Sequence, residues 1–470
     1  MSNTSYQAVI ARKPEIIKKA TNIDYAAFES GGIGFDYERM MSQAAYSLDK
    51  ICEIQRETGV GNTPLLELKN ITALARQLAG PGKGARIFIK DEACNPSGSF
   101  KARRASVSVY HAKQHGYKGV VAATSGNFGA AIASQAAMRG LKSIIVQEVF
   151  DSRGIGQPEI LEKARACEAY GAEVIQLTVG PELFYTFLLV LEQTGYFNAS
   201  LYSPFSVCGI ETLGTEIGKQ VLLATGRKPD AVVVTHAGGG NVTGTARGLQ
   251  RVDCGSTKII AASVDLKGLH MASDIDFNRK SFTTGHTGFG MPFATSPDRA
   301  DVPRNAARSL RYMDRYVTIT QGEVFYVTEM LAMLEGLERG PAGNTSLTAA
   351  FAMAQQMGRD EVIVVQETEY TGAGKHPSPQ LTFAKQNGIE VRRGNPVENV
   401  PGKAIVIPEH PRQIHVKDID LDKVRQSYLR NVVGVAAREF CPQDIEFLAA
   451  ETKLDPAIVE KKISEIQAKL

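Results

Sequence analysis

The chain has 470 residues, of which 43% are hydrophobic and 22% are charged, and its formal net charge is +3. This composition is typical of a globular protein with a large core, and the length predicts two or more domains. The small net charge gives no electrostatic argument for a nucleic-acid partner, so we expect small molecules or proteins as partners. The six cysteines form no C-x-x-C pair, which disfavours structural zinc and a disulfide framework and favours a reducing compartment.

The sequence contains no clear targeting or membrane segment. The first 20 residues lack an apolar run of the length that a signal peptide needs. The apolar run FLLVL at 187–191 is far too short to cross a bilayer. We therefore expect a cytoplasmic protein with no membrane partner.

Short β-branched runs alternate with helical patterns along the middle of the chain. The first series has expected strands at 86–90, 119–123, 142–147 and 172–177, with helical stretches near 100–116, 127–139, 156–170 and 181–194. The second series has expected strands at 231–235, 258–263 and 362–366. Apolar strands that alternate with helices predict parallel sheets covered on both faces, so the expected fold class is α/β, with two open parallel-sheet domains and a cleft between them.

We predict four units along the chain. An N-terminal helical extension covers 1–55. A C-terminal helical tail covers 399–470 and begins with a connection rich in proline and glycine at 399–413. Between them, the smaller α/β domain covers 86–205, and the larger one combines 56–85 with 206–398. A helical tail of this kind is more often a packing or assembly element than a catalytic one.

The motif NPSGSFKARR (95–104) places Lys101 after a Ser-Gly-Ser turn and before a helix-forming run. An ordinary surface lysine needs no such setting, whereas a lysine that binds a carbonyl compound covalently needs a fixed backbone around it. The charges of KARR (101–104) are interpreted as the exposed face of a helix rather than as a phosphate site.

The motif ATSGNFG (123–129) follows an expected strand and begins a helix. Its backbone N–H groups and hydroxyls could bind an anion such as a carboxylate. They could equally form a plain helix cap, because Ser and Asn are favoured at that position. Both interpretations stay open on this motif alone.

The motif THAGGGNVTG (235–244) lies between a strand and a helix and could hold a phosphate. A dinucleotide is one candidate, because Asp265 ends the next expected strand, where an acid could bind ribose. The spacing is not G-x-G-x-x-G, however, since Thr243 stands where the last glycine should be. The other candidate is a cofactor with a single phosphate.

The motif ETEYTGAGK (367–375) also follows an expected strand, and Thr371 or a neighbouring hydroxyl could meet a cofactor there. A lysine amine, a phosphate cradle, a carboxylate loop and a hydroxyl at a strand end are together what pyridoxal 5'-phosphate (PLP) requires. The sequence therefore predicts PLP bound through Lys101. His111 and His115 are spaced i, i+4, but no third ligand is apparent, so no metal site is expected.

Three motifs in this order resemble a known family: NPSGSFKAR (95–103), TSGNFG (124–129) and GGGNVTG (238–244). They resemble the fold type II PLP enzymes, the group of threonine synthase, serine/threonine dehydratases and cysteine synthase, and ERGPAGNTSL (338–347) is similar to a turn and helix found there. The resemblance covers residues 60–395 and implies the tryptophan synthase β-like fold, with the cofactor in the cleft between two domains.

The resemblance also implies a role for each candidate site residue. Lys101 would carry the Schiff base and act as the catalytic base, and Asn127 would bond to the PLP phenolic oxygen. Thr371 would face the pyridine nitrogen, although Thr368 and Glu367 lie close by. The residues implied to hold the phosphate are Gly238, Gly239, Gly240, Asn241 and Gly244. The residues implied on the substrate side are Ser97, Thr124, Ser125 and Gly126.

Taken whole, the chain is similar to a narrower family, the PLP-carrying β subunits of thiolases, although threonine synthases usually carry Asp where this chain has Ala102. That resemblance implies cleavage of 2-amino-4-oxopentanoate with coenzyme A to acetyl-CoA and alanine, in ornithine degradation. It also implies a small α subunit as partner, and we expect self-association as well.

Three alternatives remain open at this point. One is a threonine synthase-like PLP lyase or β-eliminase that acts on another amino acid. A second is a dinucleotide-dependent oxidoreductase built on the glycine loop and Asp265, which would leave Lys101 and Asn127 unused. A third is a non-catalytic homologue, which is disfavoured because every residue type expected to contact PLP is present.

Overall fold

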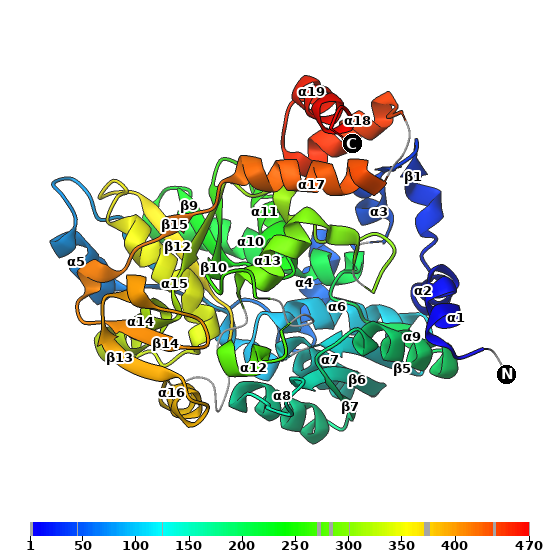
Figure 1. The fold of residues 1–470 in the computed structure, drawn as a ribbon, viewed down its shortest axis with the longest axis horizontal. Helices are drawn as coiled ribbons and strands as arrows, with labels where there is room; N and C mark the ends of the chain where they lie inside the picture. The colour runs from blue at the N-terminus through cyan, green and yellow to red at the C-terminus, as the bar shows by residue number, and fades with distance from the viewer. Residues whose placement is uncertain are drawn as a thin grey trace.

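The computed structural model describes residues 3–44, 46–124, 126–269, 274–281, 285–299, 301–370, 377–435 and 439–469. This part of the chain is built on two open sheets with helices packed around them (Figure 1). The predicted α/β fold class is therefore confirmed. Among the described helices, none combines the length and the apolar character that crossing a bilayer requires.

The larger sheet has seven strands in the order β15-β11-β10-β9-β12-β4-β3. The five inner strands are parallel, and the two edge strands are antiparallel to their neighbours. The bounds are β3 Leu65–Glu67, β4 Arg86–Asp91, β9 Ala231–Thr235, β10 Lys258–Val264, β11 Arg315–Ile319, β12 Val362–Glu367 and β15 Lys417–Asp418.

Strand β12 shows how one apolar run builds two cores. Its side chains alternate between the faces of the sheet, because successive residues of a strand point in opposite directions. Ile363 and Val365 pack in a core with helices α5, α14 and α15, whereas Val362 and Val364 pack with helices α10 and α11. A strand that is buried on both faces has no polar side to alternate with, which explains the apolar run 362–365.

The smaller sheet has four parallel strands in the order β7-β6-β5-β8. The bounds are β5 Gly119–Thr124, β6 Lys142–Phe150, β7 Glu173–Thr178 and β8 Phe197–Asn198. Two short pairs stand apart from both sheets: the hairpin β1 Glu29–Ser30 with β2 Gly34–Phe35, and the parallel pair β13 Glu390–Gly394 with β14 Ala404–Pro408. The strands and helices expected in the first series all occur, within a few residues of the predicted bounds.

The helices cover the faces of the sheets and extend beyond them at both ends of the chain (Figure 1). Their bounds are α1 Tyr6–Ala11, α2 Lys13–Thr21, α3 Tyr37–Ala44, α4 Leu48–Arg56, α5 Lys69–Leu78, α6 Lys101–Gln114, α7 Asn127–Arg139, α8 Pro158–Ala169, α9 Glu182–Thr194, α10 Pro204–Thr225, α11 Gly240–Gln250, α12 Phe277–Lys280, α13 Thr287–Thr295, α14 Gln321–Glu335, α15 Pro341–Ala354, α16 Pro377–Gln386, α17 Leu421–Val435, α18 Pro442–Thr452 and α19 Pro456–Gln467.

Two features of the predicted organisation are wrong. Strand β4 was assigned to the smaller domain, but it pairs with β12 and β3 of the larger sheet. The apolar sequence of a strand does not indicate which sheet the strand joins. For β4, the pairing with β12 determines the sheet. The segment 399–470 is also not purely helical, because β14 pairs with β13 and β15 extends the larger sheet. The remaining domain boundaries stay predictions.

The two ends of the chain are joined through Asp444 of α18. Its Oδ1 accepts hydrogen bonds from the backbone N–H groups of Gly32, Ile33 and Gly34, at 3.0, 2.7 and 2.9 Å. Figure 1 shows the C-terminal helices beside the hairpin that contains these glycines. The C-terminal segment therefore holds the N-terminal extension in place.

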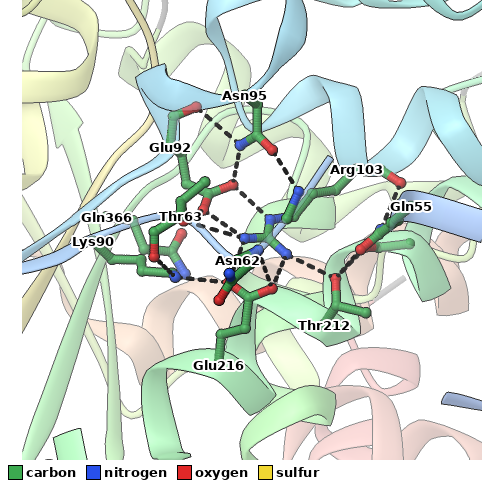
Figure 2. Close-up of polar contacts among 12 residues, drawn as sticks. Gln55, Asn62, Thr63, Lys90, Glu92, Asn95, Arg103, Thr212, Glu216 and Gln366 are labelled. Carbon is green, nitrogen blue, oxygen red and sulfur yellow. Dashed lines mark hydrogen bonds and ion pairs between the residues drawn. The ribbon is translucent and has the colours of Figure 1, made fainter. Parts of the chain in front are cut away.

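A buried ionic network fixes the helix that begins at Lys101 (Figure 2). The guanidinium of Arg103 donates two hydrogen bonds to Glu92 and two to Glu216, at 2.7–2.8 Å. Arg103 and Glu92 are fully buried, and Lys90 donates to Glu216 at 2.7 Å. These bonds connect α6 to the end of β4 and to α10, so they set the position of α6 relative to the larger sheet.

Neutral groups complete the network (Figure 2). Asn95 donates to Glu92 at 2.9 Å and accepts from the backbone N–H of Gly61. Gln55 of α4 donates to the carbonyl of Arg103 at 3.2 Å, so the N-terminal extension also contacts α6. Burial alone would raise the pKa of Glu216, but Arg103 and Lys90 lower it to about 2. Glu216 is thus held as a carboxylate, because its buried charge has cationic partners.

Replacing Arg103 tests this network. Arg103→Ala leaves Glu92 without its cation in a buried site, and we expect the free energy of unfolding to fall by about 3–5 kcal/mol. Arg227→Ala is the control, because its ion pair with Asp230 is largely exposed, and it should cost no more than about 1 kcal/mol. Urea unfolding followed by circular dichroism measures both. Similar losses for the two variants would contradict the role of the network.

Candidate active site

The structure brings four of the sequence motifs together around one cleft of about 130 Å³. The walls come from the start of α6, the loop after β5, the glycine loop after β9 and the end of β12. The predicted site residues that line it are Lys101, Thr124, Gly126, Asn127, Gly238, Gly239, Gly240 and Asn241. The carboxyl ends of parallel strands meet at this place, as is usual for ligand sites in open α/β sheets.

Backbone pairing places Lys101 beside the end of β12. The backbone N–H of Tyr370 donates to the carbonyl of Gly98 at 2.7 Å, and that of Phe100 donates to the carbonyl of Thr368 at 3.0 Å. Gly98 has φ +69°, and a Cβ there would lie 2.6 Å from the carbonyl oxygen of Tyr370. The Ser-Gly-Ser turn therefore needs its glycine so that the two segments can approach, and this approach fixes the start of α6.

The Lys101 amine has an environment that favours its neutral form. Burial lowers its pKa well below the usual value, and the positive charges of Arg104 and Lys163 lower it further. The amine forms no hydrogen bond or ion pair with the residues described here, and it lies 4.6 Å from the centre of the Phe100 ring. A largely uncharged lysine is what nucleophilic attack on an aldehyde and proton transfer near neutral pH require.

The glycine loop forms a cradle at the N-terminus of α11. Gly239 has φ +84°, and a Cβ there would lie 2.8 Å from Ser309 Oγ, while a Cβ on Gly240 would collide with the guanidinium of Arg104. Both side-chain polar atoms of Asn241 are buried and have no partner among the described residues. Free N–H groups at a helix N-terminus, a nearby cation and an unpaired amide fit the phosphate of PLP.

Arg104 was missed by the sequence analysis. KARR was interpreted as an exposed helix face, but Arg103 and Arg104 are 0% and 3% exposed, so that interpretation is wrong. Arg104 lines the cleft next to the glycine loop, donates to the carbonyl of Leu201 and has a buried Nε with no partner among the described residues. The i, i+3 spacing between Lys101 and Arg104 could have indicated that Arg104 faces the same cleft, since such residues share a helix face.

The loop after β5 shows the capping role that its sequence allowed. Thr124 Oγ1 accepts from the backbone N–H groups of Gly126 and Gly129, at 3.0 and 3.3 Å, so this hydroxyl caps α7. Asn127 faces the cleft, and its amide donates to Glu369 at 3.4 Å. The buried cation Lys163 lies beside the loop, where a Cβ on Gly126 would be 3.7 Å from its Nζ. Sequence reasoning missed this lysine, whose Nζ is paired with the carboxylate of Glu159 and lies 3.9 Å from Glu369 Oε2.

The end of β12 contributes Thr368 to the cleft wall. The neighbouring Glu367 is fully buried, and burial raises its pKa well above the usual value, with the charges of Glu369 and Asp91 adding to the effect. Burial therefore favours the protonated form of Glu367. Thr371, the predicted partner of the pyridine nitrogen, lies outside the described residues, as does Ser125.

Some of the other candidates lie away from the cleft. Gly244 packs against α10, where a Cβ would lie 2.5 Å from Ile210, so its small size serves helix packing. Ser97 does not line the cleft, although its Oγ is buried without a partner among the described residues.

Asp265 lines a different pocket with Lys267 and Lys417, which removes the geometric basis for the dinucleotide alternative. His111 stacks on Phe205, with ring centres 3.9 Å apart.

The sequence profile of the family described as "Pyridoxal-phosphate dependent enzyme" matches residues 56–369. The chain belongs to this family, so it is an enzyme whose cofactor is PLP. The predicted cofactor and the resemblance to fold type II PLP enzymes are thereby confirmed. The described Lys101, glycine cradle and Asn127 agree with that cofactor chemically.

Two relatives extend the similarity to nearly the whole chain. The 2-amino-4-ketopentanoate thiolase beta subunit of Acetoanaerobium sticklandii is 63% identical over 98% of this chain and 99% of its own length. A protein of the same name from an unknown prokaryotic organism is 64% identical over 100% of this chain and 99% of its own. Among solved structures, the cysteine synthase of Entamoeba histolytica matches with a TM-score of 0.53 at 20% identity, over 69% of this chain and 88% of that one, which shows the shared fold.

Replacing Arg104 tests its assignment to the phosphate. Arg104→Met keeps most of the side-chain volume but removes the charge, and we expect PLP affinity to fall about 10- to 100-fold, the size of a charge-assisted hydrogen bond. Absorbance titration of the protein, first stripped of PLP, measures the dissociation constant. The surface substitution Arg227→Met should leave it unchanged. Equal affinities for both variants would show that Arg104 does not contact the phosphate.

Proposed function

We propose that this chain is the catalytic β subunit of a 2-amino-4-oxopentanoate thiolase, which cleaves that substrate with coenzyme A to acetyl-CoA and alanine. The observation that supports this most strongly is the identity of 63–64% with two thiolase β subunits over almost the full length. That identity includes the segments before residue 56 and after residue 369, which the general family profile does not match. We further propose a cytoplasmic role in ornithine degradation, a small α subunit as partner and self-association.

The reaction breaks the bond between the β-carbon and the ketone carbon of the substrate. The departing β-carbon must carry negative charge, which is prohibitive without assistance. PLP, when bound, supplies a conjugated electron-withdrawing system that can delocalise this charge. The protein must then position the substrate, move protons at the α-carbon and exclude water from the cleft.

Lys101 is the residue suited to move those protons. It would hold PLP covalently through Nζ until substrate displaces it, and the freed amine would then remove the proton from the substrate α-carbon. Its lowered pKa keeps the amine unprotonated near neutral pH, so it can accept a proton. Arg104 and the α11 N-terminus would hold the phosphate, and this anchor would keep the reacting carbon within reach of Lys101.

The loop after β5 would bind the substrate carboxylate. Gly126 and Asn127 lie at the N-terminus of α7, where the helix dipole favours an anion. The buried Lys163 lies beside them and is paired with Glu159. The N-terminus of α11 would thus bind the cofactor phosphate, and the N-terminus of α7 would bind the substrate carboxylate.

A PLP lyase or β-eliminase that acts on another amino acid is the second candidate. It rests on the cleft motifs that the chain shares with threonine synthases, and Thr124 and Asn127 would serve such a substrate equally well. It does not account for the full-length identity with the thiolase subunits.

A product assay separates these candidates. The PLP-loaded chain, supplied with the α subunit, should convert 2-amino-4-oxopentanoate and coenzyme A to equal amounts of acetyl-CoA and alanine. Lys101→Ala should lower the rate at least 100-fold, because it removes both the covalent anchor and the base. Chromatography of both products measures this. Turnover of serine or O-phosphohomoserine, with no acetyl-CoA formed, would overturn the thiolase assignment in favour of the lyase.

A further inference from the structure

A second cavity of about 510 Å³ adjoins the PLP cleft. Four residues line both spaces: Thr124, Leu201, Tyr202 and Phe289. A ligand in the second cavity would therefore touch the same side chains as a substrate in the cleft. The two spaces are therefore separated only by side chains that face both of them.

The outer wall of this cavity comes from the N-terminal extension. Tyr6 and Ile10 of α1 and Lys13 of α2 line it. These residues lie before residue 56, where the match to the general family profile begins. They fall within the segment shared with the thiolase β subunits. The cavity is thus closed by a part of the chain that the general family profile does not include, which points to a ligand specific to this branch.

The lining specifies the chemistry of that ligand. One side is apolar and comes mainly from α9 and α13, through Leu183, Phe184, Leu188 and Phe293. Two cations, the partly buried Lys13 and the exposed Arg299, lie where the cavity approaches solvent. A long, mostly uncharged arm with an anionic group at its outer end fits this distribution, because the apolar walls would bury the arm and the cations would attract the anion.

We propose that this cavity holds the pantetheine arm of coenzyme A, with Glu148 as the proton acceptor for its thiol. The proposal rests on the thiolase function and names the site of its second substrate. A thiol at the end of such an arm would reach the cleft past Thr124 and Tyr202, while the phosphates would remain near Lys13 and Arg299.

Glu148 has the position and the protonation behaviour for that role. It lies on β6, one residue beyond Gln147, which pairs with Thr124 of the shared wall. Burial raises the pKa of Glu148 to about 7, and the negative charge of Glu182 raises it further. The backbone N–H of Gly180 donates to Glu148 Oε1 at 3.2 Å, which lowers the pKa and partly offsets these effects. A carboxylate that titrates near neutrality is an efficient acceptor for a thiol proton.

Other groups also bear on the charge of Glu148. Lys13 and Arg299 line the same cavity and favour the carboxylate form, whereas Asp301, also in this cavity, disfavours it. Burial raises the pKa of Asp301 to about 6, and its carboxylate accepts from Ser200 at 2.6 Å. Asp301 is thus engaged by a neighbouring hydroxyl, which leaves Glu148 as the better placed acceptor.

The step balances without an external oxidant. Glu148 takes the thiol proton, the sulfur forms a bond to the ketone carbon, and the bond between that carbon and the β-carbon breaks. The electron pair of the broken bond goes to the β-carbon, which gains a proton to become the methyl group of alanine. The acetyl group leaves as the thioester, and the proton on Glu148 returns to solvent.

A variant that fills the cavity tests the binding site. In the PLP-loaded chain with its α subunit, Leu183→Trp should raise the KM for coenzyme A at least tenfold and weaken binding of pantetheine, measured by calorimetry, to a similar extent. PLP absorbance and the KM for the amino keto acid should not change. Leu223→Trp, at a side chain that is 90% exposed, is the matched control.

Glu148→Gln tests the proton acceptor without changing the volume of the side chain. The wild-type kcat/KM for coenzyme A should rise with pH through about 7, as the carboxylate loses its proton. In the variant the value should fall about 100-fold, and the rise should move toward the pKa of a free thiol, about 8.5. Pantetheine binding should remain.

Different results would overturn the thiolase function, the coenzyme A site and the role of Glu148. If the wild type makes no acetyl-CoA, the proposed function is wrong, whatever the variants do. If the wild type makes acetyl-CoA but Leu183→Trp binds pantetheine as tightly as Leu223→Trp does, the cavity is not the site. An unaltered pH profile in Glu148→Gln would remove Glu148 from its role.

Discussion

The buried ion pairs of Arg103 are the interaction on which the rest of this structure depends. They bind the first turn of α6 to β4 and α10, through carboxylates that come from residues 11 and 113 positions away in the sequence. Because Lys101 and Arg104 lie on the same turn, the network fixes where the reactive amine and the phosphate-side cation point. A helix held only by apolar contacts could slide or rotate, whereas bidentate ion pairs define its position and its rotation.

The electrostatics of the cleft follow from that placement. Arg104 and Lys163 are buried cations that lower the pKa of the Lys101 amine, and Lys163 is itself paired with the carboxylate of Glu159. An anionic group on the cofactor would neutralise Arg104. The charge of Arg104 thus serves two purposes: it favours the neutral form of Lys101 before binding, and it would orient the cofactor.

Much of the fold and part of the site could be predicted from local sequence. The strand and helix bounds follow from apolar runs, and Lys101, Asn127 and the glycine loop stand in recognisable motifs. The errors concern partners that are distant in sequence. The burial of Arg103 depends on Glu216, the sheet to which β4 belongs depends on β12, and Gly244 is small because Ile210 packs on it. The role of the N-terminal extension in a cavity wall could not be seen from its helical pattern either, because the other walls lie more than 100 residues away.

The measurement that tests the central claim most directly is proton NMR of alanine, each enantiomer in turn, with the PLP-loaded chain in deuterated water. The thiolase reaction, run backwards from alanine, must labilise protons at the α-carbon and at the β-methyl group. The account predicts exchange of both sets with one enantiomer, abolished in Lys101→Ala. Exchange at the α-carbon alone, or none with the α subunit present, would contradict it.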